Sequence, residues 1–491
     1  MATNNLPNLL GWFSIQLNNS DTLLAKISES VNFFSNFLLV FKRFLSFSSF
    51  SSKQEFSMES TTKLAGTAII GLGYVGLPLA LALSASGKVV VGIDIDQKKI
   101  EKLERGESYL KHFEDQPIKS ALSRGDFRVS TDFQMLETVE NIIICVPTPL
   151  TKHQEPDLSA ILSTAKSISP FLQKDQLVVL ESSTFPGTTW EYLRPILEES
   201  GLRADIDFYL AYSPEREDPG NLEFDTSSIP KVVGANSKVS LERACGLYSE
   251  FIKQVVPVSD LKAAEATKIT ENVFRSVNIA LVNELKEIFD SMDIDVWEVI
   301  DAASTKPFGF MPFYPGPGLG GHCIPIDPFY LTWKAKEFGL RTRFIELAGE
   351  VNSRAPSFVV KKTTEALGRI SQRSVSGSKL LILGLAYKRD IDDMRESPSI
   401  KLMQMFERLG ASVEYHDPHI LEIPNTREHP EFMGRKSVDL SKDKLASIDA
   451  VILTTDHSAV NYEFIGNNSK IIIDTRNQYA DISCSASVIK A

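Results

Sequence analysis

Cysteine is scarce in this chain, and the spacings that mark a disulfide framework or a metal site are missing. The four cysteines stand far apart and form no C-x-x-C pair; they are Cys145, Cys245, Cys323 and Cys484. This usage argues against a disulfide scaffold or a structural zinc, and it favours a reducing, cytoplasmic compartment. The seven histidines include no H-E-x-x-H spacing, so we expect no catalytic metal.

Basic charge and long hydrophobic runs are also lacking. The 52 Lys and Arg residues are outnumbered by 63 Asp and Glu residues, which gives a net charge of -11. Nucleic-acid surfaces need concentrated positive charge, so we expect no nucleic-acid partner. The apolar run in residues 31–50 is broken by Lys42 and Arg43. The part before Lys42 has only about half of the roughly twenty residues that cross a bilayer, so no transmembrane span is predicted.

Residues 1–63 differ from the rest of the chain and are rich in Phe and Ser towards residue 50. Three interpretations stay open: an organellar presequence, a membrane-surface helix, or an extension ahead of a start at Met58. Asp21 and Glu29 weigh against a transit peptide, which is usually poor in acidic residues. The segment therefore has no part in the fold prediction.

Beyond this segment, short apolar runs alternate with helical stretches, the pattern of a parallel sheet covered by helices. Each run is nearly all apolar, as expected of strands buried on both faces; they span residues 67–70, 89–94, 141–146, 177–182 and 208–211. We predict a doubly wound α/β domain over residues 64–258. Since 491 residues exceed what one core supports, further domains are expected.

A long helix should connect this domain to a second one. Ser259 and Asp260 supply an N-cap, and no Gly or Pro follows before about Met292, which gives a helix of roughly 45–50 Å. Its apolar stripe is either core or a dimer seam and consists of Ile269, Val273, Val277, Ala280, Leu281, Leu285 and Ile288. Residues 259–356 are predicted as a helical connector. Strand-like runs return at 379–383, 412–415, 450–454 and 470–474, which predicts a second Rossmann-like domain over residues 357–491.

A dinucleotide fingerprint opens the first domain. Gly71, Gly73 and Gly76 follow a strand directly and begin a helix, so the turn can approach a pyrophosphate at the helix N-terminus. Asp94 stands eighteen residues after Gly76, where a carboxylate accepts the ribose hydroxyls of NAD and repels the extra phosphate of NADP. NAD is the expected cofactor. Two later strand ends carry Thr148 and Thr184, which we expect to face the nicotinamide half.

The densest chemical signal is the loop at residues 313–327, which reads FYPGPGLGGHCIPID. Its glycines allow close approach to a ligand, and no packing argument needs Cys323 there. A thiolate can trap an aldehyde, pass its hydride to NAD and leave a thioester for hydrolysis, which also needs an oxyanion stabiliser and a base. Lys268 and Asn272 share one face of the long helix and are candidates for these roles. From the helix alone, a solvated Lys and Asn would be the simpler interpretation.

Taken together, these motifs resemble the UDP-glucose/GDP-mannose dehydrogenase family over residues 65–480. The matching segments are GLGYVGLPLA, the Thr148 turn, SSTFPGTT, YSPEREDPGN, the Lys268–Asn272 helix, GGHCIPID and GLAYKRDIDDMRESPS. The resemblance implies a four-electron oxidation that uses two NAD molecules, with Cys323 as nucleophile, Lys268 in acid/base and oxyanion work, and Asp327 assisting water.

The resemblance also assigns binding residues. Substrate contacts are expected from Glu215, Arg216, Lys268, Asn272, Arg275, Phe313, Tyr314, Gly320, Tyr387 and Lys388. Glu215 joins the catalytic set with Asn272. NAD contacts are expected from Gly71, Gly73, Tyr74, Val75, Gly76, Asp94, Lys99, Thr148, Thr184 and Arg395. The second domain has only Gly384 of a fingerprint, so we expect it to hold UDP. A homodimer through the central helix is implied.

The chain looks like the UDP-N-acetylglucosamine 6-dehydrogenase branch, because Ile326 stands where UDP-glucose enzymes typically carry Lys. UDP-N-acetylgalactosamine is nearly as plausible, and UDP-glucose and UDP-N-acetylmannosamine rank lower. Two other classes compete: a two-electron hydroxyacid-type dehydrogenase, which needs no cysteine, and a non-catalytic UDP-sugar-binding protein. Release of two NADH per sugar would support the four-electron oxidation, and release of one NADH would support the two-electron dehydrogenase.

Overall fold

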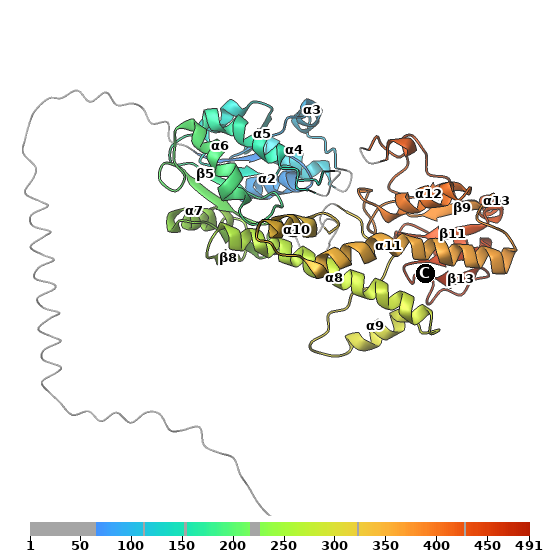
Figure 1. Ribbon diagram of the computed structural model, residues 1–491. Coiled ribbons are helices and arrows are strands. Elements are labelled where there is room, and N and C mark those ends of the chain that lie inside the picture. The colour runs from blue at the N-terminus through green and yellow to red at the C-terminus, as the bar shows by residue number, and fades with distance from the viewer. Residues whose placement is uncertain (1–64, 111–112, 152–154, 217–225, 322–323, 427–428) are drawn as a thin grey trace, which may run out of the picture. The chain divides into compact units, whose positions relative to one another are not determined.

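The computed structural model describes residues 65–110, 113–151, 155–216, 226–321, 324–426 and 429–491 (Figure 1). They belong to one unit, Lys63–Ala491. The predictions for residues 1–63 and for Cys323 lie outside the described residues. Within the described ranges, none of the helices has the length and apolar content that a bilayer crossing requires.

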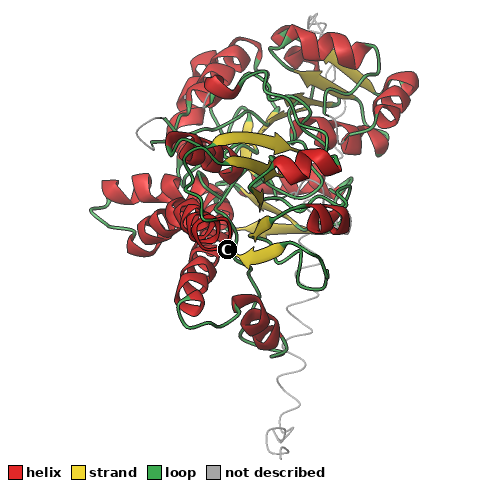
Figure 2. Cartoon of the chain, turned by 90° about the vertical axis from the view of Figure 1, so that its right-hand side faces the viewer, coloured by secondary structure: helices red, strands yellow, loops and turns green. Residues whose placement is uncertain are grey.

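The first sheet has eight strands in the order β3-β2-β1-β4-β5-β6-β7-β8, parallel except for the β6–β7 pair. Its strands are β1 Thr67–Ile70, β2 Val90–Ile93, β3 Phe127–Ser130, β4 Asn141–Ile144, β5 Leu177–Leu180, β6 Tyr209–Tyr212, β7 Lys231–Gly234 and β8 Val255–Val258. Ile70 packs into one core cluster and its neighbour Ile69 into another, because successive side chains point to opposite faces. Helices therefore cover both faces, as the all-apolar strands predict. Figure 2 shows the strands of the chain with helices packed around them.

The helices of this domain follow the strands in alternation. They are α2 Gly76–Ala85, α3 Gln97–Glu104, α4 Asp115–Arg124, α5 Ser159–Ile168, α6 Arg194–Leu197 and α7 Lys238–Ser249, with short turns η1 Phe133–Thr138, η2 Ser169–Phe171, η3 Thr188–Leu193 and η4 Glu198–Ser200. The strand order is the one expected of a dinucleotide-binding domain.

The connector is helical. Helix α8, Leu261–Asp290, begins where the sequence predicts, because Asp260 accepts a hydrogen bond from the Ala263 amide at 2.8 Å. It packs against α10 Asp327–Glu337 and α11 Arg343–Ala366, which ends in η5 Leu367–Ser371; α9 Val296–Ser304 follows α8 (Figure 1).

The second sheet is parallel throughout, in the order β10-β9-β11-β12-β13. Its strands are β9 Lys379–Leu383, β10 Ser412–His416, β11 Ala450–Leu453, β12 Ile471–Asp474 and β13 Ser487–Lys490, and its helices are α12 Pro398–Arg408, α13 Lys442–Ser447 and α14 Tyr462–Asn468, with η6 Pro430–Phe432. The α/β prediction with two Rossmann-like domains and a long central helix is confirmed.

Four strands escaped the sequence prediction: β3, β7, β8 and β13. Three of them, β3, β8 and β13, are edge strands with partly exposed side chains, so they lack the all-apolar run of an interior strand. The pattern therefore predicts the interior of each sheet better than its rim.

Candidate active site

The glycine turn of the first domain has the geometry that a pyrophosphate site needs. Gly71 has φ +92°, and a Cβ on it would lie 2.5 Å from the Cys145 carbonyl oxygen. A Cβ on Gly76 would lie 2.0 Å from the Gly71 oxygen, so helix and strand can pack this closely only around glycine. Gly73 has no heavy atom within 4 Å of its Cβ position, which leaves its backbone open to a ligand.

The acid after β2 is already oriented. Asp94 accepts hydrogen bonds at 2.9 Å from the Leu72 amide, the Asp96 amide and the Lys99 ammonium, and it is almost buried. Asp94 and Lys99, both predicted to bind NAD, therefore form an ion pair with each other. The Leu72 bond fixes the carboxylate against the glycine turn, which is where a ribose would lie.

The remaining predicted cofactor residues gather at the same sheet edge. Val75 is the N-cap of α2 and gives that helix no side-chain cap. Tyr74 lies under the guanidinium of Arg395, 5.0 Å from the ring centroid, and burial followed by the charge of Asp393 raises the pKa of Tyr74 to about 12. Thr148 is buried. The structure thus brings Tyr74 and Arg395 together from opposite ends of the chain.

Helix α8 buries polar side chains along one face for most of its length. We call this set the polar stripe: Glu265, Lys268, Asn272, Ser276, Asn283 and Lys286. Figure 1 shows α8 as the long helix drawn from green to yellow. The simpler interpretation of a solvated Lys and Asn is wrong, because Lys268 is 6% and Asn272 2% exposed. A buried polar group must be hydrogen-bonded, and the bonds of this stripe run both to loops and to the neighbouring helices α10 and α11.

Lys268 and Asn272, at the centre of the stripe, lie beside the buried Asp327 of α10. The Asn272 amide donates to Asp327 Oδ2 at 2.6 Å. The other carboxylate oxygen, Oδ1, has no hydrogen-bond partner among the described residues. Burial raises the pKa of Asp327 to about 6, against the opposing charge of Lys268 and the hydrogen bonds of Asn272 and Ser183. A carboxylate with one free oxygen and this pKa suits a base.

The Glu215 turn is tied to the same helix. The Lys268 ammonium donates to the Glu215 carbonyl oxygen, and the Glu215 carboxylate lies 3.7 Å from Lys231. Burial works against the charge of Lys231, but Glu181, at 2.8 Å, and Glu215 raise the pKa of Lys231 above its ordinary value. Arg216 pairs with Glu271 of α8 at 2.8 Å. Residues 217–225 lie outside the described part of the chain.

The cysteine loop starts between α8 and the second domain. Gly316 donates to Asn283 at 3.0 Å and accepts from Lys286 at 3.2 Å. A Cβ on Gly316 would lie 2.9 Å from Arg476 Nη1, and one on Gly320 would lie 2.5 Å from Tyr387 Cβ. Glycine at these two positions therefore makes room for side chains of the second domain, and the expected ligand contact of Gly320 stays a prediction.

The other predicted substrate residues lie around this loop. Phe313 packs edge-on against Phe274 of α8, with ring centroids 5.7 Å apart. The Tyr314 hydroxyl donates to Asp301 of α9 at 2.7 Å, and Arg275 is exposed on α8. Lys388 is half-buried beyond the carboxyl end of β9.

Arg476, which the sequence analysis missed, follows the carboxyl end of β12 directly. Its Nε donates to the Thr454 carbonyl at 2.7 Å. A strand run that ends in Asp474-Thr475-Arg476 was the available signal, because ligands in such sheets bind beyond the carboxyl ends of strands. The residue adds positive charge beside the cysteine loop.

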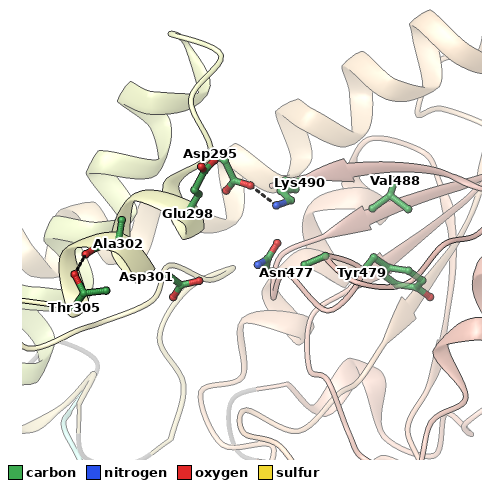
Figure 3. Close-up of a pocket in the computed structure, with 10 residues that line it drawn as sticks. Asp295, Glu298, Asp301, Ala302, Thr305, Asn477, Tyr479, Val488 and Lys490 are labelled. Atoms are coloured by element: carbon green, nitrogen blue, oxygen red, sulfur yellow. Dashed lines mark hydrogen bonds and ion pairs between the residues drawn. The ribbon is translucent and has the colours of Figure 1, made fainter.

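A separate groove of about 700 Å³ lies between α9 and the last strands of the second sheet (Figure 3). The Asp295 carboxylate and the Lys490 ammonium pair across it. None of the predicted site residues lines this groove.

Comparison with known proteins gives consistent matches along the chain. Models of the UDP-glucose/GDP-mannose dehydrogenase family match as follows: the NAD binding domain residues 65–252, the central domain residues 262–354, and the UDP binding domain residues 381–481.

Among curated relatives, a UDP-N-acetyl-D-mannosamine dehydrogenase of Pyrococcus horikoshii is 35% identical over 417 residues, covering 84% of this chain and 95% of the relative. A UDP-N-acetyl-D-glucosamine 6-dehydrogenase of Pseudomonas aeruginosa is 35% identical over 418 residues, covering 83% and 96%. The solved structure of a UDP-D-ManNAc dehydrogenase from Pyrococcus horikoshii matches with a TM-score of 0.77 at 33% identity, covering 86% of this chain and 98% of that one.

Proposed function

The chain belongs to the UDP-glucose/GDP-mannose dehydrogenase family and is an NAD-dependent nucleotide-sugar 6-dehydrogenase, and from this premise we propose that its substrate is a UDP-N-acetylhexosamine. The C6 hydroxyl is oxidised to a carboxylate, and UDP-N-acetylglucosamine is the favoured sugar. Two relatives of nearly equal identity carry names with different N-acetylhexosamines, so the hexosamine class has stronger support than the epimer.

NAD fits the residues of the first domain. Gly73 has open space, the uncapped N-terminus of α2 begins beyond it, and Asp94 stands ready for a ribose. When bound, NAD accepts one hydride in each of the two oxidation steps. Arg395 and Tyr74 would close the other side of this site.

The observation that carries the proposal is the buried trio of Lys268, Asn272 and Asp327. In the proposed mechanism, Cys323 adds to the C6 aldehyde, a second hydride leaves the resulting thiohemiacetal, and water hydrolyses the thioester. Lys268 stabilises the oxyanion that forms in each step, and Asn272 holds Asp327 in place. Asp327 takes a proton from the attacking water through its free oxygen.

The UDP half is proposed to bind the second domain at the carboxyl ends of β9 and β12. Lys388 and Arg476 stand there, and a diphosphate needs such local positive charge in an acidic chain. Glu215 contacts Lys268 of α8, and Arg216 pairs with Glu271 of the same helix. Both residues are proposed to contact the sugar.

A homodimer through α8 is part of the proposal. On its solvent side the helix exposes Phe274, Leu281 and Ile288, each between 46% and 49% exposed. These three repeat every seven residues, which is the spacing of a helix–helix seam. Replacing Leu281 and Ile288 with Glu should yield a monomer in sedimentation; an unchanged dimer would place the interface elsewhere.

The decisive experiment measures NADH release with UDP-GlcNAc, UDP-GalNAc and UDP-glucose side by side. Two NADH per sugar support the four-electron reaction, and one NADH supports a two-electron dehydrogenase. Cys323→Ala should abolish uronate formation while UDP-sugar binding persists. Unchanged turnover in that variant would refute the covalent mechanism.

A further inference from the structure

Glu265 is the most deeply buried member of the polar stripe, and the proposed mechanism gives it no role. It is 0% exposed and lies one helical turn before Lys268 on the same face of α8. Three residues along a helix correspond to roughly 4.5 Å, so its carboxylate neighbours the reacting centre without belonging to it.

Its hydrogen bonds among the described residues go to the turn after β5. One carboxylate oxygen accepts from the Gly187 amide, and the other accepts from the Thr189 amide at 2.8 Å and the Thr189 hydroxyl at 2.7 Å. The turn leads into η3, whose N-cap Gly187 has φ +107° and supplies no side-chain cap. Glu265 therefore caps η3 from a different part of the chain, as an acidic side chain does best at a helix N-terminus.

The capped turn carries Thr184, the residue expected against the nicotinamide half. The Thr184 hydroxyl donates to Thr188 Oγ1 at 2.5 Å, and Thr188 Oγ1 donates to the Phe185 carbonyl at 2.9 Å. The Phe185 ring is fully buried and lies 4.9 Å from Trp333 between ring centroids. The turn is thus held rigidly, and Glu265 is its buried link to α8.

We propose that Glu265 is a positioning residue for hydride transfer, which fixes the Thr184 turn at one distance from Lys268. The turn is expected to contact the cofactor, and Lys268 is expected to contact the sugar. The distance between the turn and Lys268 therefore sets the distance that the hydride crosses. This inference rests on the proposed function, but not on which hexose is the substrate.

Glu265 is not placed to act as a base. Both oxygens are occupied by three donors from one turn, whereas Asp327 keeps a free oxygen. Burial raises the pKa of Glu265 to about 7, and the hydrogen bonds of Thr189 and Gly187 oppose that rise. Such a costly buried carboxylate is retained where a fixed geometry is needed.

The test variant is Glu265→Gln, which keeps the shape but turns an NH2 group towards an amide donor. We expect the single-turnover rate of the first NADH, measured by stopped flow at saturating NAD and sugar, to fall roughly 10- to 100-fold. Calorimetric Kd values for NAD and UDP should change less than about threefold, since binding groups are untouched. The matched control is Glu191→Gln in η3, whose exposed carboxylate pairs with Lys262 and Lys334, and its rate should stay within about twofold of wild type.

A first-hydride rate equal to wild type would overturn the proposal, and so would a loss that disappears when NAD is raised. If Glu265→Gln does not fold, Thr189→Val removes one donor and should slow the first hydride roughly threefold or more; a lower melting temperature with an unchanged rate would make Glu265 purely structural. All variants are assayed with the UDP-sugar that the wild type oxidises fastest. An error in the hexosamine assignment would then appear in the substrate panel and leave this comparison intact.

Discussion

The two Rossmann-like domains begin alike and end with different ligands. In the first, the Gly71 amide donates to Ile93 at 2.8 Å and Asp94 follows β2; in the second, the Gly384 amide donates to His416 at 2.8 Å and Asp417 follows β10. Gly71 and Gly384 have φ values of +92° and +90°. The backbone thus repeats, and what distinguishes the domains is how each acid is used.

The carboxylate of Asp417 is already hydrogen-bonded to donors of the protein itself. It accepts from the Leu385 and Ala386 amides at 2.6 and 3.0 Å, and from Nε2 of the buried His457 at 3.0 Å. His457 can donate there because its Nδ1 accepts from the Asp390 amide at 3.0 Å. Asp94 meets a flexible, part-exposed lysine instead. An acid already saturated by buried donors cannot accept a ribose, which gives a physical reason to expect no second NAD site in this domain.

The helices that follow the two glycines differ in the same sense. Helix α2 starts at Gly76 without a side-chain cap, so its N-terminus can receive a phosphate. Helix α12 starts only at Pro398 and is capped by Ser397, whose side chain accepts from the Ser399 amide. The Ser399 hydroxyl donates to the Gly384 carbonyl at 2.9 Å, where the first domain has the bare Gly76. The second fingerprint site is therefore closed by side chains.

The largest effect on activity is expected at Asp327, a buried aspartate with one carboxylate oxygen that has no hydrogen-bond partner among the described residues. Since burial raises its pKa to about 6 and the ionised form is the proposed base, wild-type kcat should be retained above pH 6 and fall as the pH drops below it. Asp327→Asn should lower kcat roughly 100-fold or more and remove that pH step. A pH–rate profile of both proteins decides the matter; an unaltered step in the variant would assign it to another group.

The next largest effect is expected on the stability of the fold. It is tested at Asp417, whose carboxylate is already hydrogen-bonded to several buried donors. Burial would raise the pKa of Asp417, but the hydrogen bond from His457 and two backbone amides hold it well below its ordinary value. Asp417→Ala leaves these buried donors without an acceptor, so we expect a loss of roughly 3–5 kcal/mol, read as a lower melting temperature. The Kd for NAD should hardly change. A variant as stable as wild type would contradict this account of the second domain.

Asp94 stands at the position of the first domain that corresponds to Asp417, and there we expect a substitution to impair the use of the cofactor. Asp94→Ala removes the ribose acceptor and should raise KM for NAD roughly 10- to 100-fold, while turnover with NADP improves because a repelling charge is gone. Steady-state kinetics with both cofactors measures this. Asp96→Ala, an exposed N-cap of α3, is the control and should leave both KM values within about twofold. Equal effects of the two variants would mean that Asp94 acts only through the fold.

Sequence patterns predicted the features that depend on local chemistry. The glycine turn, the acid eighteen residues on, the start of α8 and the interior strands all follow from short-range rules. The polar stripe did not, because a Glu or Lys on a helix is usually solvated and only tertiary packing buries Glu265 and Lys286. The packing of Arg476 and Tyr387 against the loop glycines was not predicted for the same reason, since both side chains come from distant segments.

The smallest effect is expected at Arg395, a residue of the second domain that contacts the Tyr74 ring of the first domain. Arg395 is part-exposed, is held by Asp393 and covers the Tyr74 ring, so it should add only about 0.5–1 kcal/mol to NAD binding. Arg395→Met keeps the apolar stem and should raise KM for NAD about two- to fivefold. A double-mutant cycle with Tyr74→Leu isolates the pair, because the two losses should be less than additive if the guanidinium acts through the ring. Fully additive losses would show that Arg395 and Tyr74 serve NAD independently, and the second domain would then contribute to the cofactor site by direct contact alone.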